Sequence, residues 1–221
     1  MRRSFPLAAI AGVGSLFGIA CSSATRISGG AAAPGGASQS ATSDAPGRYP
    51  FTAADVHFMS GMIPHHAQAV LIAGWAPSHG ARQDVRLLCE RIVVAQRDEI
   101  VLMQTWLRDR RQPAPAADAT RLKMKMDGVE HDMLMPGMLS LEELAQLDRA
   151  RGPEFDRLFL LAMIKHHEGA ISMVDQLFGS EGAGQDEIVF RFASDVYADQ
   201  TTEIERMHKM LAAQPSGGRN P

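Results

Sequence analysis

The chain has 221 residues, of which 45% are hydrophobic, 21% are charged and only 6% are aromatic, and its formal net charge at pH 7 is −3. This composition is typical of a globular protein with one main domain, and the abundance of Ala, Leu and Met favours helices over sheets. The mild acidity and the lack of a basic stripe argue against a nucleic-acid partner.

Residues 1–21 are interpreted as an export signal rather than as part of the fold. Arg2 and Arg3 provide a positive start, and an apolar run follows up to Cys21. The end of this run is similar to a bacterial lipobox, in which the cysteine becomes the lipidated first residue, although Gly18 replaces the usual aliphatic residue. Cys21 is therefore either lipidated or removed. We expect an exported protein of the periplasm or cell surface, anchored to the membrane by a lipid at Cys21.

Residues 22–50 are rich in Gly, Ala, Ser and Pro, a composition that indicates a flexible tether. The folded domain is expected to span residues 51–214. Its first part, residues 51–111, contains two helical patterns separated by a break at Pro77. Pro64 lies inside the first helical pattern and is expected to kink it.

A Met-rich crossover, residues 112–152, follows and is expected to be mobile until a short helix begins at Ser140. A capping box, formed by Ser140 and Glu143, marks the start of that helix. Residues 153–214 then repeat the two-helix pattern. Two long αα-hairpins joined by a crossover predict an all-α fold, a four-helix bundle.

The two hairpins are copies of one another. Segment 62–70 (MIPHHAQAV) returns as segment 163–171 (MIKHHEGAI), a shift of 101 residues. Segment 96–103 (QRDEIVLM) returns as segment 200–207 (QTTEIERM), a shift of 104 residues. Apolar positions can recur simply to build a core. Polar side chains kept on core-facing helix positions need a chemical reason, because an unpaired buried polar group costs roughly 1–3 kcal/mol.

The repeated His, Glu and Met side chains are candidate metal ligands. We expect His66 to lie near Glu99, and His167 near Glu203, at equivalent places in the bundle. Imidazole binds Zn, Cu, Fe and Ni, whereas thioether selects copper, above all Cu(I). The alternative is a structural His-Glu hydrogen-bond network without metal. The candidate ligands on the helices are His65, His66, Glu99, Met103, His166, His167, Met173, Glu203 and Met207.

The crossover offers a second and softer set of ligands, on a segment expected to wrap an ion. The alternative is a Met-rich flap that fills gaps in the core. Copper, as Cu(I) or Cu(II), is the metal that suits both sets. The candidate ligands of the crossover are Met124, Met126, His131, Met133, Met135 and Met138.

At these residues the chain resembles the domain-of-unknown-function 305 family. The resemblance rests on the two His-His doublets, on the repeated Gln-x-x-Glu-Ile-x-x-Met run and on the segment 135–140 (MPGMLS), and it extends over residues 55–211. It implies a duplicated ferritin-like bundle with an export signal and, for some members, periplasmic or extracellular copper binding linked to copper tolerance. Many members carry Met where this chain has Ile72.

The expected function is copper binding in the cell envelope, to buffer the metal or to deliver it to other copper-handling proteins, without catalysis. Two alternatives stay open. One is a ferritin-like dimetal redox enzyme, for which this chain has too few carboxylates, because that class uses about four Glu and paired Glu-x-x-His motifs. The other is a metal-free adaptor or stress protein at the membrane surface.

Overall fold

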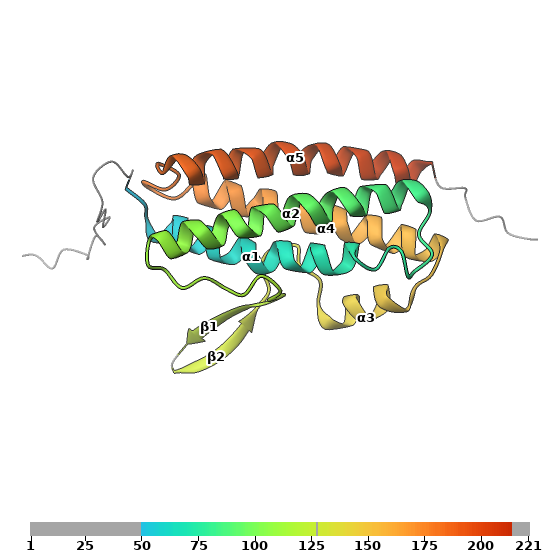
Figure 1. Cartoon of the computed structure of the whole chain (residues 1–221), viewed down its shortest axis with the longest axis horizontal. Helices are drawn as coiled ribbons and strands as arrows, with labels where there is room; N and C mark the ends of the chain where they lie inside the picture. Colours follow the sequence, from blue (N-terminus) through green and yellow to red (C-terminus); the bar gives the residue numbers. More distant parts are fainter. Residues whose placement is uncertain (1–49, 127, 214–221) are drawn as a thin grey trace, which may run out of the picture. The chain divides into compact units, whose positions relative to one another are not determined.

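Four long helices make up the bundle in the computed structural model, which describes residues 50–126 and 128–213. They are α1 (Ala53–Ala73), α2 (Gln83–Asp109), α4 (Pro153–Phe178) and α5 (Glu187–Ala212). Helix α1 packs on α2, α4 packs on α5, and the two hairpins meet along α1 and α4 (Figure 1). The predicted all-α bundle of two αα-hairpins is confirmed. The expected export signal with Cys21, and the tether up to residue 49, lie outside the described residues.

The starts of α1 and α4 have sequence features that favour a helix N-terminus. Thr52 Oγ1 accepts the backbone N–H of Asp55 at 3.2 Å, and the Asp55 carboxylate accepts the backbone N–H of Thr52 at 2.6 Å, so α1 starts with a capping box. Pro153 stands in the first turn of α4, where its missing N–H costs nothing. The helix α1 continues through Pro64 to Ala73. Within the described residues, no helix is long and apolar enough to cross a membrane.

The repeated aspartates at the starts of α1 and α4 tie the two hairpins together. Asp55 accepts the backbone N–H of Gly184, in the loop between α4 and α5, at 2.7 Å. Asp156, its equivalent in the second copy, accepts the backbone N–H of Arg82, in the loop between α1 and α2, at 3.3 Å. Each hairpin therefore anchors the turn of the other, which is the reciprocity expected of a pseudo-twofold arrangement.

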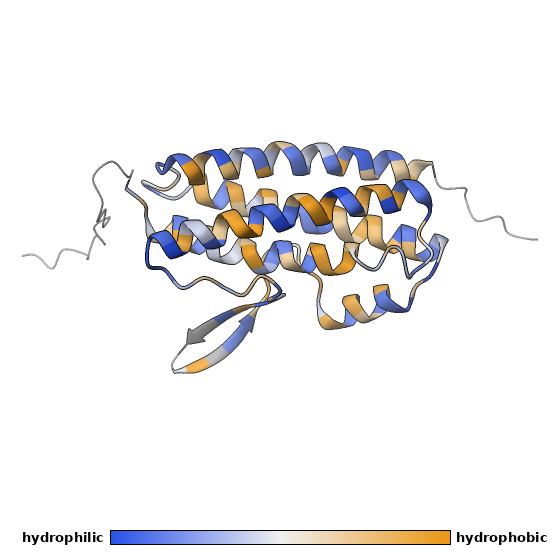
Figure 2. Cartoon of the chain, viewed as in Figure 1, coloured by the Kyte–Doolittle hydropathy of each residue, from blue (hydrophilic) through white to orange (hydrophobic). Residues whose placement is uncertain are grey.

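The hydrophobic core consists of two separate clusters. One contains Phe58, Met59 and Trp106, together with residues from the C-terminal half of α4 and the N-terminal half of α5. The other contains Phe155, Phe159 and residues from the opposite halves of the helices. Figure 2 shows that hydrophobic and hydrophilic residues alternate along the bundle helices, as expected where one side of each helix is buried. The two clusters are separated from each other midway along the bundle.

The crossover is more ordered than the sequence analysis expected. It forms an antiparallel β-hairpin of β1 (Leu122–Met126) and β2 (Val129–Met133), in which Met124 pairs with His131. This part of the crossover thus has regular secondary structure, which the expectation of a mobile segment did not include. The physical reason is an alternation of Met with Lys that is followed by Gly128, which adopts a positive φ of 83°.

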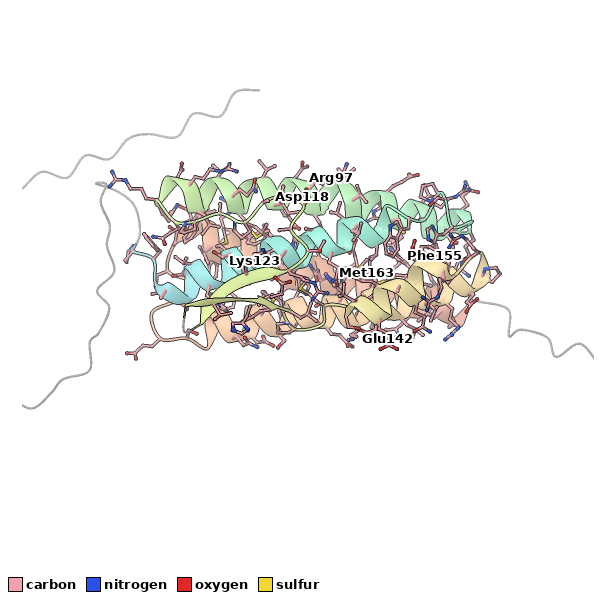
Figure 3. The ribbon with its side chains drawn as sticks, turned by 90° about the horizontal axis from the view of Figure 1, so that it is seen from below. Arg97, Asp118, Lys123, Glu142, Phe155 and Met163 are labelled. Carbon is pink, nitrogen blue, oxygen red and sulfur yellow. The ribbon has the colours of Figure 1, made fainter. Side chains whose placement is uncertain are left out.

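The helix that follows the hairpin, α3 (Leu141–Arg149), is as predicted. Its capping box is complete, because Ser140 Oγ accepts the backbone N–H of Glu143 and the Glu143 carboxylate accepts that of Ser140. The hairpin and α3 lie on the side of the bundle formed by α1 and α4, below it in Figure 1. Figure 3 views this side directly, with Lys123 of the hairpin and Glu142 of α3 labelled.

Candidate metal centre

A polar layer crosses the middle of the bundle, between the two hydrophobic clusters, and all four long helices contribute to it. Helices α1 and α4 supply the two His-His doublets, of which all four side chains are 0% exposed. Helices α2 and α5 supply the two Gln-x-x-Glu pairs. A core that is interrupted by four buried imidazoles gives up apolar contact at its centre, and such a cost is typical of functional sites.

The first ring of each doublet meets its equivalent across the contact between α1 and α4. The centroids of the His65 and His166 rings are 3.8 Å apart, with an angle of 40° between the ring planes. Burial, reinforced by the proximity of His66, lowers the pKa of His65 from 6.5 to about 3. Burial and then the proximity of His65 also lower the pKa of His166 well below 6.5. Both rings are therefore neutral near pH 7, which is the form that a metal ion binds.

The second ring of each doublet faces the glutamate of its own hairpin, as predicted. His66 Nε2 lies 2.8 Å from Glu99 Oε2, although without good hydrogen-bond geometry. His167 Nε2 donates to Glu203 Oε2 at 2.7 Å. The ring centroids within the doublets are 6.2 Å and 6.3 Å apart, so the two copies have nearly the same geometry.

Each of the four rings keeps at least one nitrogen without a hydrogen-bond partner. His65 Nε2 donates to the carbonyl of Pro136 at 3.0 Å, which leaves a lone pair on Nδ1. The bond from His167 Nε2 to Glu203 likewise leaves a lone pair on Nδ1. A histidine that ligates a metal usually donates its other N–H to a carbonyl or carboxylate in this way. Buried polar atoms without partners are rare in folded proteins and demand an explanation.

The segment 135–139 of the crossover covers the layer on the side of α1 and α4. Gln68 of α1 holds it with two hydrogen bonds, donating to the carbonyl of Leu139 at 3.0 Å and accepting its N–H at 2.7 Å. The position equivalent to Gln68 in the second copy is Gly169, where an added Cβ would collide with the carbonyl of Pro136. The glycine lets the segment pass directly over α4, with Gly137 at a positive φ of 77°.

Two of the expected thioether ligands, Met103 and Met207, lie in different parts of the core. Both side chains are fully buried, but they belong to different hydrophobic clusters. A pseudo-twofold axis across the bundle places copies at opposite ends, and four residues of helix separate a Met from its Glu by about 6 Å.

Three of the candidate methionines instead gather beside the layer. Met133, Met135 and Met173 line a cavity of about 300 Å³ together with His57. Sequence analysis missed His57 because it occurs in the first copy only. Its position on α1, two turns before the doublet, is the signal that could have found it. The cavity combines three sulfur atoms with one imidazole, a donor set that suits Cu(I).

The remaining candidates of the crossover lie in the β-hairpin or in the core. Met124, Met126 and His131 belong to the hairpin strands, whereas Met138 is buried and its sulfur accepts the backbone N–H of Met135 at 3.3 Å. Cys89 is a free thiol, 2% exposed, whose pKa burial raises to about 12, so it is a small core residue as expected.

The donor chemistry of the layer fits a metal ion, although the side chains are not gathered around one. Among residues 50–126 and 128–213, no three His, Cys, Asp or Glu side chains stand close enough together to hold an ion as they are placed. Binding of an ion by these side chains would require them to move. The imidazole nitrogens without partners, and the Gln96 and Gln200 side-chain oxygens, which also lack partners, are the donors available for it.

The model of one protein family, the domain of unknown function DUF305, matches residues 55–211 of the chain. A DUF305 protein of Streptomyces coelicolor, described as secreted, is similar in structure, with a TM-score of 0.60 and 28% identity over 72% of this chain and 92% of that one. A DUF305 fragment from Deinococcus radiodurans is similar with a TM-score of 0.60 and 27% identity, over 75% of this chain and 99% of the fragment. No curated protein matches the chain.

The chain is also similar to CopM, a protein solved with bound metal ions. The Cu(I)-bound form of CopM matches with a TM-score of 0.53 and 26% identity, over 72% of this chain and 95% of CopM. The Cu(II)-bound form matches with a TM-score of 0.55 at the same identity and coverage. CopM has also been solved with silver.

Proposed function

The chain belongs to the DUF305 family, and from that premise we propose that it is an exported copper-binding protein that buffers or delivers copper in the cell envelope. One observation carries the proposal. Four neutral or Glu-paired imidazoles interrupt the core, and each has a ring nitrogen without a protein partner. A structural His-Glu network would leave those nitrogens paired.

The choice of copper is supported by ligand chemistry and by similarity. Imidazole accommodates both copper oxidation states, whereas thioether favours Cu(I). The polar layer offers nitrogen and oxygen donors, and the neighbouring cavity offers the sulfur atoms of Met133, Met135 and Met173 with the ring of His57. The similarity to CopM, which binds copper in both oxidation states, favours the same metal here.

Export and anchoring complete the proposal. The first 21 residues have the pattern of an export signal, and one structural relative is described as secreted. A lipid at Cys21 would hold the protein at the membrane, where other envelope proteins that handle copper could exchange the ion with it. We propose no catalysis, because the layer contributes only Glu99 and Glu203 as carboxylates where a dimetal enzyme uses about four.

Metal content tests this function. The purified protein is incubated with copper, zinc and iron in turn, desalted, and analysed for bound metal by mass spectrometry. We expect stable binding of copper in preference to the others. A variant with His66→Gln and His167→Gln should bind less copper, whereas His208→Gln, an exposed histidine on α5, should bind as much as the wild type. If the double variant bound as much copper as the wild type, the buried histidines of the polar layer would not be the binding site.

The sulfur cavity is tested separately with Cu(I). Replacing Met133, Met135 and Met173 by Leu keeps most of the apolar volume and deletes the sulfur atoms, so the protein should fold while its affinity for Cu(I) falls. Affinity is measured by competition with a Cu(I) chelator. An unchanged affinity would mean that these methionines only fill the core.

A further inference from the structure

A groove runs between α2 and α5. These two helices make few direct contacts, although each packs closely on its own hairpin partner. The groove has a volume of about 900 Å³ and is lined by Gln96 and Glu99 from α2 and by Asp199, Gln200 and Glu203 from α5. Helix α5 lies on the side of the bundle away from the β-hairpin (Figure 1), so the groove opens away from the crossover.

The groove is negatively charged. Five carboxylates and two guanidinium groups line it. Partial burial, followed by the nearby charges of Glu99, Asp195 and Glu203, raises the pKa of Asp199. Such a field attracts cations and raises the rate at which they arrive.

Two buried amide oxygens add a second, independent feature. Gln96 and Gln200 are 3% and 4% exposed, line the groove, and have side-chain oxygens without a hydrogen-bond partner. An amide oxygen is a suitable ligand for a cation that is losing its water shell. The repeated Gln therefore has a chemical use that packing does not supply.

The groove leads to the buried histidines. Glu99 and Glu203 are 23% and 19% exposed in the groove, and their carboxylates touch His66 and His167, which are fully buried, at 2.8 Å and 2.7 Å. On the opposite side, the crossover covers the layer, with Pro136 against His65 and Gly137 against α4.

We propose that the groove between α2 and α5 is the entrance through which a hydrated divalent cation reaches the buried histidines. Asp199 attracts the ion, the oxygens of Gln96 and Gln200 replace part of its water shell, and Glu99 and Glu203 pass it to the imidazoles. The inference rests on the proposed copper binding, and it adds the route and the residues that determine the rate of loading.

Stopped-flow loading with Cu(II) tests the route. Binding is followed by quenching of the intrinsic tryptophan fluorescence in the full chain at low ionic strength. Asp199→Asn should slow loading about two- to fivefold, with the amount of copper bound at saturation unchanged, and the pair Gln96→Leu and Gln200→Leu should slow loading by a similar factor. The wild-type rate should also fall as salt is added. Asp98→Asn removes the same charge from an exposed position outside the groove and should load at the wild-type rate.

The outcomes separate the route from the function. A wild-type protein that binds no copper overturns the proposed function. Copper binding with wild-type loading rates in Asp199→Asn and in the double Gln variant overturns the entrance alone. If the double variant fails to fold, Asp199→Asn decides, because its side chain is exposed. Equal slowing by Asp98→Asn would show an effect of overall charge and would also overturn the entrance.

Discussion

Replacement of Gly169 by Ala should destabilise the protein by wedging the crossover away from α4. The added Cβ would collide with the backbone carbonyl of Pro136, and a carbonyl cannot rotate away as a flexible side chain can. Overpacking of this kind costs about 1–3 kcal/mol. Helix propensity favours Ala over Gly by roughly 1 kcal/mol and offsets part of that cost.

The displacement has a further cost, because the same segment carries three hydrogen bonds to α1. His65 donates to the carbonyl of Pro136, and Gln68 makes two bonds with the backbone of Leu139. Each is worth about 1 kcal/mol, and all three weaken if the segment moves. The balance is a loss of about 2–4 kcal/mol. At about 2–4 °C per kcal/mol for a chain of this size, the melting temperature should fall by about 4–16 °C.

Differential scanning calorimetry measures this loss, with Gly61→Ala as the matched control. Gly61 also lies inside a helix beside the crossover, but an added Cβ would meet the side chain of Met135, with the sulfur at 2.9 Å. That side chain can change rotamer, so the cost should be small and the gain in helix propensity should offset it. A wild-type melting temperature for Gly169→Ala, or an equal loss in both variants, would refute the argument.

Three further predictions concern buried polar groups. The stability of the metal-free protein should decline as the pH falls from about 6.5 towards about 3, by up to about 1.4 kcal/mol per pH unit for His65 alone. The reason is that the pKa of His65 is about 3 in the folded protein and near 6.5 in the unfolded chain, so that unfolding takes up a proton. Melting curves across this pH range measure the decline, and a flat profile would contradict the prediction. His66→Gln and His167→Gln should each cost about 1–3 kcal/mol without metal and should lose most of the copper-induced rise in melting temperature, whereas a full copper-induced rise would make the doublets structural. Asp186→Ala should cost about 3–5 kcal/mol in urea unfolding, because Asp186 caps α5 and pairs with the buried Arg110, and a loss below 1 kcal/mol would contradict this.

The four long helices, and the approach of one ring of each His-His doublet to a glutamate, could be predicted from the sequence. Both depend on local hydrophobic periodicity and on the internal repeat. The shift between the copies carries His66 onto His167, and the structure gives both rings a glutamate partner. The burial of the remaining ring of each doublet could not be predicted from one helix. His65 and His166 lie fully inside only because the two copies meet there and the crossover covers them.

The position of a side chain along the bundle axis also could not be predicted from the sequence. A helical wheel shows that Met103 shares a face with Glu99, but it does not show that the antiparallel copies send Met103 and Met207 to opposite ends. The pairing of Asp55 with the loop of the other hairpin depends in the same way on tertiary contacts. The β-hairpin, by contrast, had a local signal, the Met-Lys alternation before an Asp-Gly dipeptide, that the expectation of a mobile segment overlooked.

X-ray absorption at the copper edge tests the central claim most directly, because it reports which atoms surround the ion. Protein loaded with one equivalent of Cu(II) should show a shell of nitrogen and oxygen neighbours together with the outer-shell scattering that imidazole rings produce. That imidazole signal should weaken in the variant with His66→Gln and His167→Gln. A spectrum without imidazole scattering, or one that is the same in wild type and variant, would contradict copper binding by the buried histidines.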